Sequence, residues 1–362
     1  MKRTNSFLNI VAAAFCAFAL TTSFQSCAIV DNPSGDDPVV DDGIKTANEL
    51  IAAIGRGDQF IKLAPGATIT LTDKLVIPQQ VVITGDEKNL PTIFANQGIE
   101  FANNFAATCV NFDGTNNTNA LLTLAAEPVV ETLPGSEYYL IQSITLMNCR
   151  FNNIKGSIIW DSNVKYCVQD LTICDCGFIL NTESTNNQAF FSFQGGGVKD
   201  FYCTYSTFSQ KGEAENNYFL RYNNSARLDR YGYDKETNTQ SINYINNTFY
   251  KVCTNGQWGN YNGYAGQKYT AFTVTGNIWV DCGNNQVPRR ILGGRNASSY
   301  NTCVFFDNSY WYNNMPEQGI ENYDETGGMT CNPMLKDPEN GDFTPTGEDQ
   351  VAKKTGDPHW YK

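Results

Sequence analysis

One spacing of apolar and polar residues recurs through the middle of the chain. An aromatic residue follows a short polar turn, and apolar residues stand seven and five positions before it. Six segments share this frame: Ile144, Leu146 and Phe151; Leu171, Ile173 and Phe178; Phe201, Cys203 and Phe208; Ile242, Tyr244 and Phe249; Phe272, Val274 and Trp279; Cys303, Phe305 and Tyr310. The aromatic residues lie 27, 30, 41, 30 and 31 positions apart. The chain therefore contains a repeat with a period near 30 residues.

This repeat favours a coil of strands over paired helices or a leucine-rich horseshoe. Apolar residues two positions apart form one face of a strand, and turn formers such as the "INNT" before Phe249 are poor material for a helix interior. Each copy is too short and too polar to bury its own apolar side, so the copies must stack. We predict an all-β, single-stranded, right-handed parallel β-helix in which the aromatic rings form one internal column.

Asparagine stands two positions before the aromatic residue in three copies, at Asn247, Asn277 and Asn308. In a stack of coils these side chains would lie above one another, each amide bonding the next. We interpret them as a structural ladder rather than as ligand-binding residues.

A capping helix is predicted just before the first strands. The segment "TANELIAAIG" has an N-cap candidate, Thr46, with Glu49 three positions later, which is a capping box. Leu50, Ile51 and Ile54 give the helix an apolar face. Such a helix would cover the open first coil, whose apolar side chains and backbone groups are otherwise exposed.

The chain divides into three parts on these patterns. Residues 1–27 form a predicted signal peptide, residues 28–42 a flexible tether, and residues 43–362 one β-helix domain. The Pro- and Gly-punctuated segment from Asn332 to Tyr361 is expected to wrap the last coil.

The first 27 residues are typical of an exported precursor. Lys2 and Arg3 precede an apolar stretch, and small and polar residues lead to Cys27. No positively charged stop follows Cys27, which disfavours a transmembrane anchor. The stretch "FQSC" resembles the relaxed lipobox of bacterial lipoproteins, although Phe24 and Gln25 depart from its commoner pattern. We expect Cys27 to be lipidated and its acyl chains to anchor the protein to a membrane, with simple secretion as the alternative.

The tether is rich in Asp, Pro and Gly, and lacks aromatic residues. An acidic stretch at this place resembles the export tag of surface lipoproteins in gut-type, glycan-degrading Gram-negative bacteria; a plain spacer is the alternative. The expected location is the outer membrane, lipid-anchored and at the cell surface.

Charge and cysteine usage narrow the class of partner. Without residues 1–27 the chain keeps 23 basic and 37 acidic residues, a formal net charge of −14, which disfavours nucleic acid. Ten cysteines remain, most of them in apolar or alternating runs, so we expect free, buried thiols; disulfides are the alternative. No C-x-x-C pair occurs, and a zinc or redox motif has no support.

The chain resembles exported β-helix lipoproteins of the pectate-lyase-like superfamily, many of them known only as domains of unknown function. The resemblance rests on the segment from Glu49 to Asp86, on the repeated "NNTF" and "GNIW" turns, and on the closing "DPENGDFT" and "GDPHW". It covers nearly the whole mature chain. These are turn and capping elements, so they specify the fold better than the chemistry.

The resemblance implies, where there is activity, a lyase or hydrolase acting on acidic polysaccharides. A lyase would need a Lys or Arg base, and Ca²⁺ or an Arg to neutralise the uronate carboxylate. Lys251, Arg289 and Arg290 are the candidates; the alternative is that they form surface ion pairs. We find no Asp-rich metal cluster and expect no cofactor, Ca²⁺ being relevant only to a lyase. The one histidine, His359, rules out a His-based triad or zinc site, and we take it for a packing residue.

The 41-residue interval carries an insertion from Lys211 to Gln240 that should leave the coil as a loop. This loop and the turn region after it are rich in aromatic residues and arginine beside Asn and Gln, which suits the apolar face and hydroxyls of a sugar. The candidate binding residues are Tyr222, Arg227, Tyr231, Tyr233, Trp258, Tyr261, Tyr264, Arg289 and Arg295. We predict a shallow groove that holds polysaccharide without cleaving it, and a polysaccharide lyase is the alternative.

Overall fold

The structure is a computed structural model, and its described residues begin after the predicted tether. They are residues 42–181, 189–211, 218–254, 258–261, 268–283, 287–292, 297–312 and 325–361, without the side chains of residues 288, 289 and 297. Cys27 and the signal segment lie outside them. Residues 42–362 form one compact unit. Among the described residues, no helix has the length and apolar character needed to cross a bilayer.

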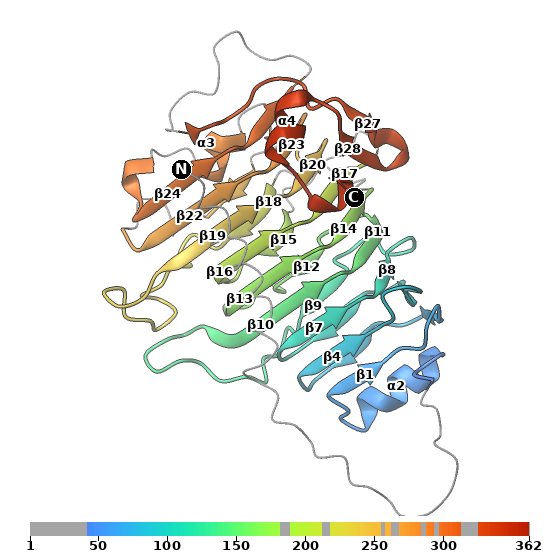
Figure 1. The fold of residues 1–362 in the computed structure, drawn as a ribbon. Helices are drawn as coiled ribbons and strands as arrows, with labels where there is room; N and C mark the ends of the chain where they lie inside the picture. Colours follow the sequence, from blue (N-terminus) through green and yellow to red (C-terminus); the bar gives the residue numbers. More distant parts are fainter. Residues whose placement is uncertain are drawn as a thin grey trace, which may run out of the picture. The chain divides into compact units, whose positions relative to one another are not determined.

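Three long sheets of parallel strands make up this unit (Figure 1). Sheet 1 contains, in spatial order, β1 (Phe60–Lys62), β4 (Val81–Thr84), β7 (Phe105–Thr108), β10 (Tyr139–Met147), β13 (Tyr166–Cys174), β16 (Gly197–Thr204), β19 (Gln240–Ile245), β22 (Thr270–Thr275), β24 (Thr302–Phe306) and β26 (Glu325–Thr326). Sheet 2 contains β2 (Thr68–Leu71), β5 (Thr92–Ala95), β8 (Asn111–Asp113), β11 (Arg150–Ile154), β14 (Gly177–Leu180), β17 (Thr207–Gln210), β20 (Thr248–Tyr250), β23 (Ile278–Val280) and β25 (Ser309–Trp311). Sheet 3 contains β3 (Leu75–Ile77), β6 (Ile99–Phe101), β9 (Leu122–Leu124), β12 (Ile159–Trp160), β15 (Ala189–Phe193), β18 (Tyr218–Tyr222) and β21 (Gly259–Asn260).

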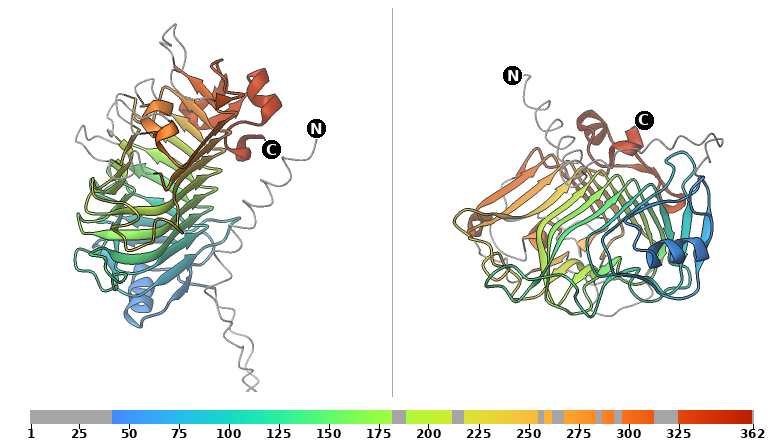
Figure 2. Two further views of the ribbon diagram at one scale, coloured as in Figure 1. Left: turned by 90° about the vertical axis from the view of Figure 1, so that its left-hand side faces the viewer. Right: turned by 90° about the horizontal axis from the view of Figure 1, so that it is seen from below.

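Up to β21 the chain visits the three sheets in turn, so each coil adds one strand to each sheet; after β21 the described strands β22 to β26 belong to sheets 1 and 2. Figure 2 shows the coils stacked on one another from α2 toward the C-terminal segment. The predicted parallel β-helix is therefore confirmed. The β-helix begins before the six copies, since β1 to β9 already form coils. The short strands of these first coils lack an aromatic repeat of the same strength, so the sequence pattern did not mark them.

The aromatic residues of the six copies pair with one another in register along sheet 2. Their rings stack nearly parallel, with neighbouring centroids 4.2 to 5.4 Å apart. Phe112 of β8 adds a ring below Phe151, at 5.2 Å. All of these rings are buried, so the predicted column is the centre of the core.

The asparagine ladder is also confirmed. The side-chain amide of Asn247 donates to Oδ1 of Asn277, and that of Asn277 donates to Oδ1 of Asn308, both at 2.9 Å. The amide of Asn308 donates in turn to Oε1 of Glu325, again at 2.9 Å. Burial raises the pKa of the Glu325 carboxyl, which ends the ladder. In the earlier coils the same place holds Ser206, Cys176 and Cys149.

Helix α2 (Ala47–Gly55) caps the first coil as predicted. Thr46 and Glu49 form the capping box, and Leu50, Ala53 and Ile54 are buried against the core. Ile51, however, is 53 % exposed, so its assignment to the buried face is wrong. The buried stripe follows positions i, i+3 and i+4, and Ile51 lies one residue off it.

The segment 332–361, here called the C-terminal wrap, takes a different course from the one predicted. Its elements are β27 (Leu335–Asp337), η3 (Pro338–Asn340), β28 (Asp342–Pro345), α4 (Glu348–Lys353) and η4 (Pro358–Tyr361); α3 (Val287–Ile291) and η2 (Ala297–Ser299) precede it. It does more than wrap the last coil, because it runs back over the outer face of sheet 2 as far as Thr207 (Figure 1). There Phe343 packs on Tyr250, Ile278 and Val280, which would otherwise expose apolar side chains.

All ten cysteines of the described residues are free thiols, and eight of them are buried. Cys303 is half-buried and Cys331 is exposed. The expectation of free, buried thiols therefore holds for eight of these cysteines. It does not hold fully for Cys303, which is half-buried, or for Cys331, which lies just before the C-terminal wrap and is exposed.

Candidate functional site

A groove of about 370 Å³ lies where the C-terminal wrap meets the outer face of sheet 2. We call it the wrap groove. Its floor comes from β8, β11, β14 and β17, and its wall comes from the wrap. The polar, charged and aromatic side chains that line it include Asn111, Arg150, Asn152, Asp175, Thr207, Lys211, Tyr250, Glu339, Asp357, His359 and Trp360. Cations, carboxylates, amides and aromatic rings thus meet in one open cleft, which is the mixture expected of a binding site for a polar ligand.

A row of amide side chains crosses the floor of the groove. The amide of Asn152 donates to Oδ1 of Asn111 at 2.7 Å, and the amide of Asn111 donates to Oγ1 of Thr92 at 3.0 Å. Both asparagines are half-buried. The row holds these amides in fixed directions and leaves them further capacity to donate and accept hydrogen bonds.

Trp360 forms the aromatic part of the wall. Its indole nitrogen donates to Oγ1 of Thr207 at 2.7 Å, and its ring lies edge-to-face with Phe343 and His359. The side chain is half-buried, so part of the ring remains accessible. His359 is exposed and lines the groove, so it is a rim residue in contact with Trp360 and not a core packing residue.

Asp357 fastens the wrap to sheet 2. One carboxylate oxygen accepts a hydrogen bond from the Thr207 hydroxyl at 2.7 Å, and the other accepts one from the backbone nitrogen of His359 at 2.9 Å. Its own backbone nitrogen donates to Oγ1 of Thr248 at 3.0 Å. Burial raises the pKa of this carboxyl to about 6, and the hydrogen bonds oppose that shift only in part.

Lys251 borders the groove but is already paired. Its ammonium lies 2.5 Å from Oε1 of Glu339, which also accepts a hydrogen bond from the Tyr250 hydroxyl at 2.6 Å. The hydrogen bond to Glu339 raises the pKa of Lys251. A general base must be neutral to take a proton, so this environment opposes the lyase role considered for Lys251.

The structure corrects the role of four predicted sugar-binding aromatic residues. Tyr222, Tyr231, Trp258 and Tyr261 are each no more than 1 % exposed. Tyr222 belongs to β18, while Trp258 and Tyr261 flank β21, and their rings point into the coil. The insertion is therefore only partly a loop, because residues 218–222 form a strand of sheet 3.

Tyr231 lies in the loop of residues 223–239 and reaches back into the core. Its ring is edge-to-face with Tyr138 at 5.1 Å, and its hydroxyl lies over Gly197, where a side chain would collide with it. The loop therefore closes the side of the coil instead of presenting an aromatic surface. None of these four rings lines the wrap groove.

The other predicted site residues lie apart from the groove or outside the described residues. Arg227 is half-buried and paired with Asp229 at 2.9 Å, and the hydroxyl of Tyr233 donates to Oε1 of Gln169 at 3.0 Å. Arg290 is half-buried in α3, which packs on β21 of sheet 3. Tyr264, Arg295 and the side chain of Arg289 lie outside the described residues.

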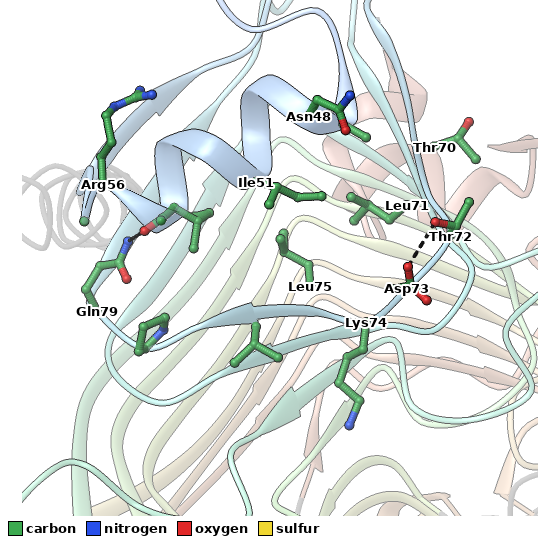
Figure 3. Close-up of a pocket in the computed structure, with 16 residues that line it drawn as sticks. Asn48, Ile51, Arg56, Thr70, Leu71, Thr72, Asp73, Lys74, Leu75 and Gln79 are labelled. Carbon is green, nitrogen blue, oxygen red and sulfur yellow. Dashed lines mark hydrogen bonds between the residues drawn. The ribbon is translucent and has the colours of Figure 1, made fainter.

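A second, larger cavity of about 830 Å³ lies between α2 and strands β2 and β3 (Figure 3). Ile51, Leu71 and Leu75 line it. Its charged residues do not converge on the cavity: Lys74 points away and pairs with Glu100 at 3.1 Å. The wrap groove, where polar and aromatic groups meet, is therefore the candidate functional site.

The described residues contain no group of three or more His, Cys, Asp or Glu side chains arranged to hold a metal ion. Nothing in the wrap groove was picked out by sequence as a site, apart from the candidate base Lys251 at its margin. Its residues come from six coils and from the wrap, where Trp360 contacts Thr207 from 153 positions away along the chain.

Residues 241–360 match a protein family described as a domain of unknown function, DUF5123. The match spans 120 of the 362 residues and covers the last coils and the wrap, including Tyr250, Glu339, Asp357 and Trp360. Comparison with curated proteins and with solved structures finds no match.

Proposed function

We propose that this protein binds polysaccharide in the wrap groove, without cleaving it. The observation that carries the proposal is the joint position of the Asn111–Asn152 amide row and the half-buried Trp360 ring in one open groove. Sugars offer hydroxyls to amides and an apolar face to an aromatic ring. An open groove along the outside of the coils also admits a chain longer than the groove itself.

A lyase is not proposed. Lys251 is paired with Glu339, which favours its protonated form. Arg290 does not lie beside it, because Arg290 belongs to α3, which packs on sheet 3, whereas Lys251 follows β20 of sheet 2. The candidate base Lys251 and the candidate neutralising group Arg290 therefore do not meet around one substrate position, and the pairing of Lys251 opposes its use as a base.

Replacing both groove asparagines tests the binding site. The double variant Asn111→Ala, Asn152→Ala should weaken polysaccharide retention about thirtyfold, since each lost amide removes hydrogen bonds worth about 1 kcal/mol, or about 2 kcal/mol for the pair. Affinity electrophoresis through gels that contain single polysaccharides measures this. Thr172→Ala, a half-buried polar residue on sheet 1, is the matched control and should migrate like the unchanged protein. Equal retention of all three proteins would place the binding elsewhere.

We further propose that the protein acts at the cell surface, anchored to the outer membrane through Cys27 as part of a glycan-utilisation system. The basic start, the apolar stretch, "FQSC" and the acidic tether support this location. Labelling of expressing cells with radioactive palmitate should place label in the protein, and Cys27→Ser should abolish it. Unlabelled protein, or label that persists in the Cys27→Ser variant, would exclude lipidation at this residue.

A further inference from the structure

Arg150 lies in the floor of the wrap groove and is held by one nitrogen of its guanidinium. Nη1 donates to the backbone oxygen of Cys149 at 3.0 Å and to that of Asp175 at 3.1 Å. These two bonds use both hydrogens of Nη1 and fix the plane of the group. The side formed by Nε and Nη2 has no hydrogen-bond partner among the described residues, and this side is the fork that arginine uses to hold an oxyanion through two parallel bonds.

The neighbouring coil leaves room for this arrangement. Gly177 pairs with Arg150 in register on β14. A Cβ added at Gly177 would lie 3.0 Å from Cδ and 3.5 Å from Nε of Arg150. The arginine stem therefore lies across the glycine, flat on the outer face of sheet 2, and a side chain at residue 177 would displace the guanidinium.

The guanidinium of Arg150 has no hydrogen bond or ion pair to a carboxylate among the described residues, although it lies near enough to Asp357 to be one of the groups that lower the pKa of that carboxyl. The protein carries a formal net charge of −12, yet no ion pair of the described residues includes Arg150. The Asp357 carboxylate accepts its hydrogen bonds from Thr207 and His359, and Asp175 accepts the hydrogen bond from Arg150 through its backbone oxygen. A half-buried guanidinium in an acidic protein would normally be paired within the protein.

We propose that the Nε–Nη2 side of Arg150 is an oxyanion-binding site, which takes a carboxylate or sulfate substituent of the bound glycan. This inference rests on the proposed function and names the chemistry that the groove selects. The oxyanion receives two parallel hydrogen bonds from Arg150, and Lys211 at the groove margin adds positive charge. Sugar hydroxyls on either side contact the amide row and Trp360, so that the charged substituent fixes the register of the chain in the groove.

The test compares polymers that differ only in their oxyanion. Affinity electrophoresis uses homogalacturonan against its fully methyl-esterified form, and a sulfated galactan against the same galactan after desulfation. The unchanged protein should be retained at least tenfold more strongly by one charged polymer than by its neutral counterpart. The polymer pair that shows the difference distinguishes a carboxylate from a sulfate.

Two variants assign the preference to this residue. Arg150→Gln should reduce retention by the charged polymer about tenfold and leave retention by the neutral polymer unchanged. Arg150→Lys keeps the charge but lacks the two parallel donors, so its retention by the charged polymer should lie between that of the unchanged protein and that of Arg150→Gln. Arg56→Gln, an exposed arginine paired with Asp58 near the cap, is the matched control and should behave like the unchanged protein. The esterification and desulfation arms need no variant, so they test the inference even where a substitution disturbs folding.

The outcomes separate the two proposals. Equal retention by charged and neutral polymers overturns the oxyanion site and leaves polysaccharide binding intact. A charged preference that survives in Arg150→Gln also overturns it, because another cation must then supply the contact. Absence of retention by every polymer overturns both the oxyanion site and the proposed function.

Discussion

Replacing Asn277 with alanine is expected to lower the free energy of unfolding by about 3–5 kcal/mol. Its side-chain oxygen accepts hydrogen bonds from the backbone and side-chain nitrogens of Asn247, both at 2.9 Å, and its amide donates to Oδ1 of Asn308 and to the backbone oxygen of Tyr244. All three asparagines are fully buried, so no water replaces the lost partner. Several polar groups on both neighbouring coils would be left without hydrogen bonds.

Thermal and urea denaturation of matched variants measure this effect. Asn277→Ser should cost less than Asn277→Ala, because the same place in the stack is held by Ser206 one coil before Asn247. Asn116→Ala, which replaces an exposed asparagine, should change stability by less than about 0.5 kcal/mol. A loss below about 1 kcal/mol for Asn277→Ala would show that the ladder contributes little to stability.

The variant Asp357→Asn is expected to gain stability relative to the unchanged protein as the pH rises from about 4 to about 6. The pKa of Asp357 is about 6 in the folded state and 3.8 as its ordinary value, so the folded protein binds this proton more tightly than the unfolded chain. The contribution of Asp357 to the free energy of unfolding therefore falls between pH 4 and pH 6 and is level above that window. The loss approaches 3 kcal/mol, since one pKa unit corresponds to about 1.4 kcal/mol.

Asparagine cannot ionise, and it can keep the acceptor for the His359 backbone nitrogen. Unfolding temperatures of both proteins, measured at pH 4, 5, 6, 7 and 8, should diverge across this window and run parallel above it. Burial also raises the pKa of Asp161, to about 7, and the pKa values of Asp170 and Glu325, but these groups are present in both proteins and cancel in the comparison. Profiles that stay parallel from pH 4 to pH 8 would mean that Asp357 is not the titrating group.

The repeat could be predicted from sequence because its signal is local. Each copy carries its own strand face, turn and aromatic residue, and stacking then places the rings of Phe151 and Phe178 in contact whatever the loops between them do. The ladder followed for the same reason, since Asn247 and Asn277 occupy the same place in successive copies. The coil of Phe112 fits the same frame, but its second apolar position is Ala107, which gives a weaker signal.

The wrap groove could not be predicted in this way, because its residues do not recur at equivalent positions of successive coils. Arg150 and Asn152 occur in one coil only, and Asp357 and Trp360 reach Thr207 from about 150 positions away. The sequence held only indirect signals of the groove. One is Gly177, which is a glycine at a strand position where the neighbouring coils have side chains. The other is the pair of apolar residues on the outer face of β23, which must be covered by another segment.

The tyrosines were misassigned because composition does not separate the two sides of a strand. A tyrosine beside asparagine and arginine suits a sugar-binding surface, and it also suits an interior that accepts large amphipathic rings. Tyr222 and Tyr261 lie at strand ends whose register was not visible in the sequence, and both rings point inward. Tyr231 is buried through a tertiary contact with Tyr138, which no local pattern contains.

The proposed binding of polysaccharide in the wrap groove is tested most directly by filling the groove with a bulky side chain and measuring retention by the polysaccharide. Asn152→Trp adds a bulky ring to the groove floor on the outer face of sheet 2, away from the ring column and the asparagine ladder. If the wrap groove holds the glycan, a polysaccharide that retains the unchanged protein in affinity electrophoresis will no longer retain Asn152→Trp, while the unfolding temperatures of the two proteins agree. Equal retention of both proteins by that polysaccharide would show that the wrap groove is not the binding site.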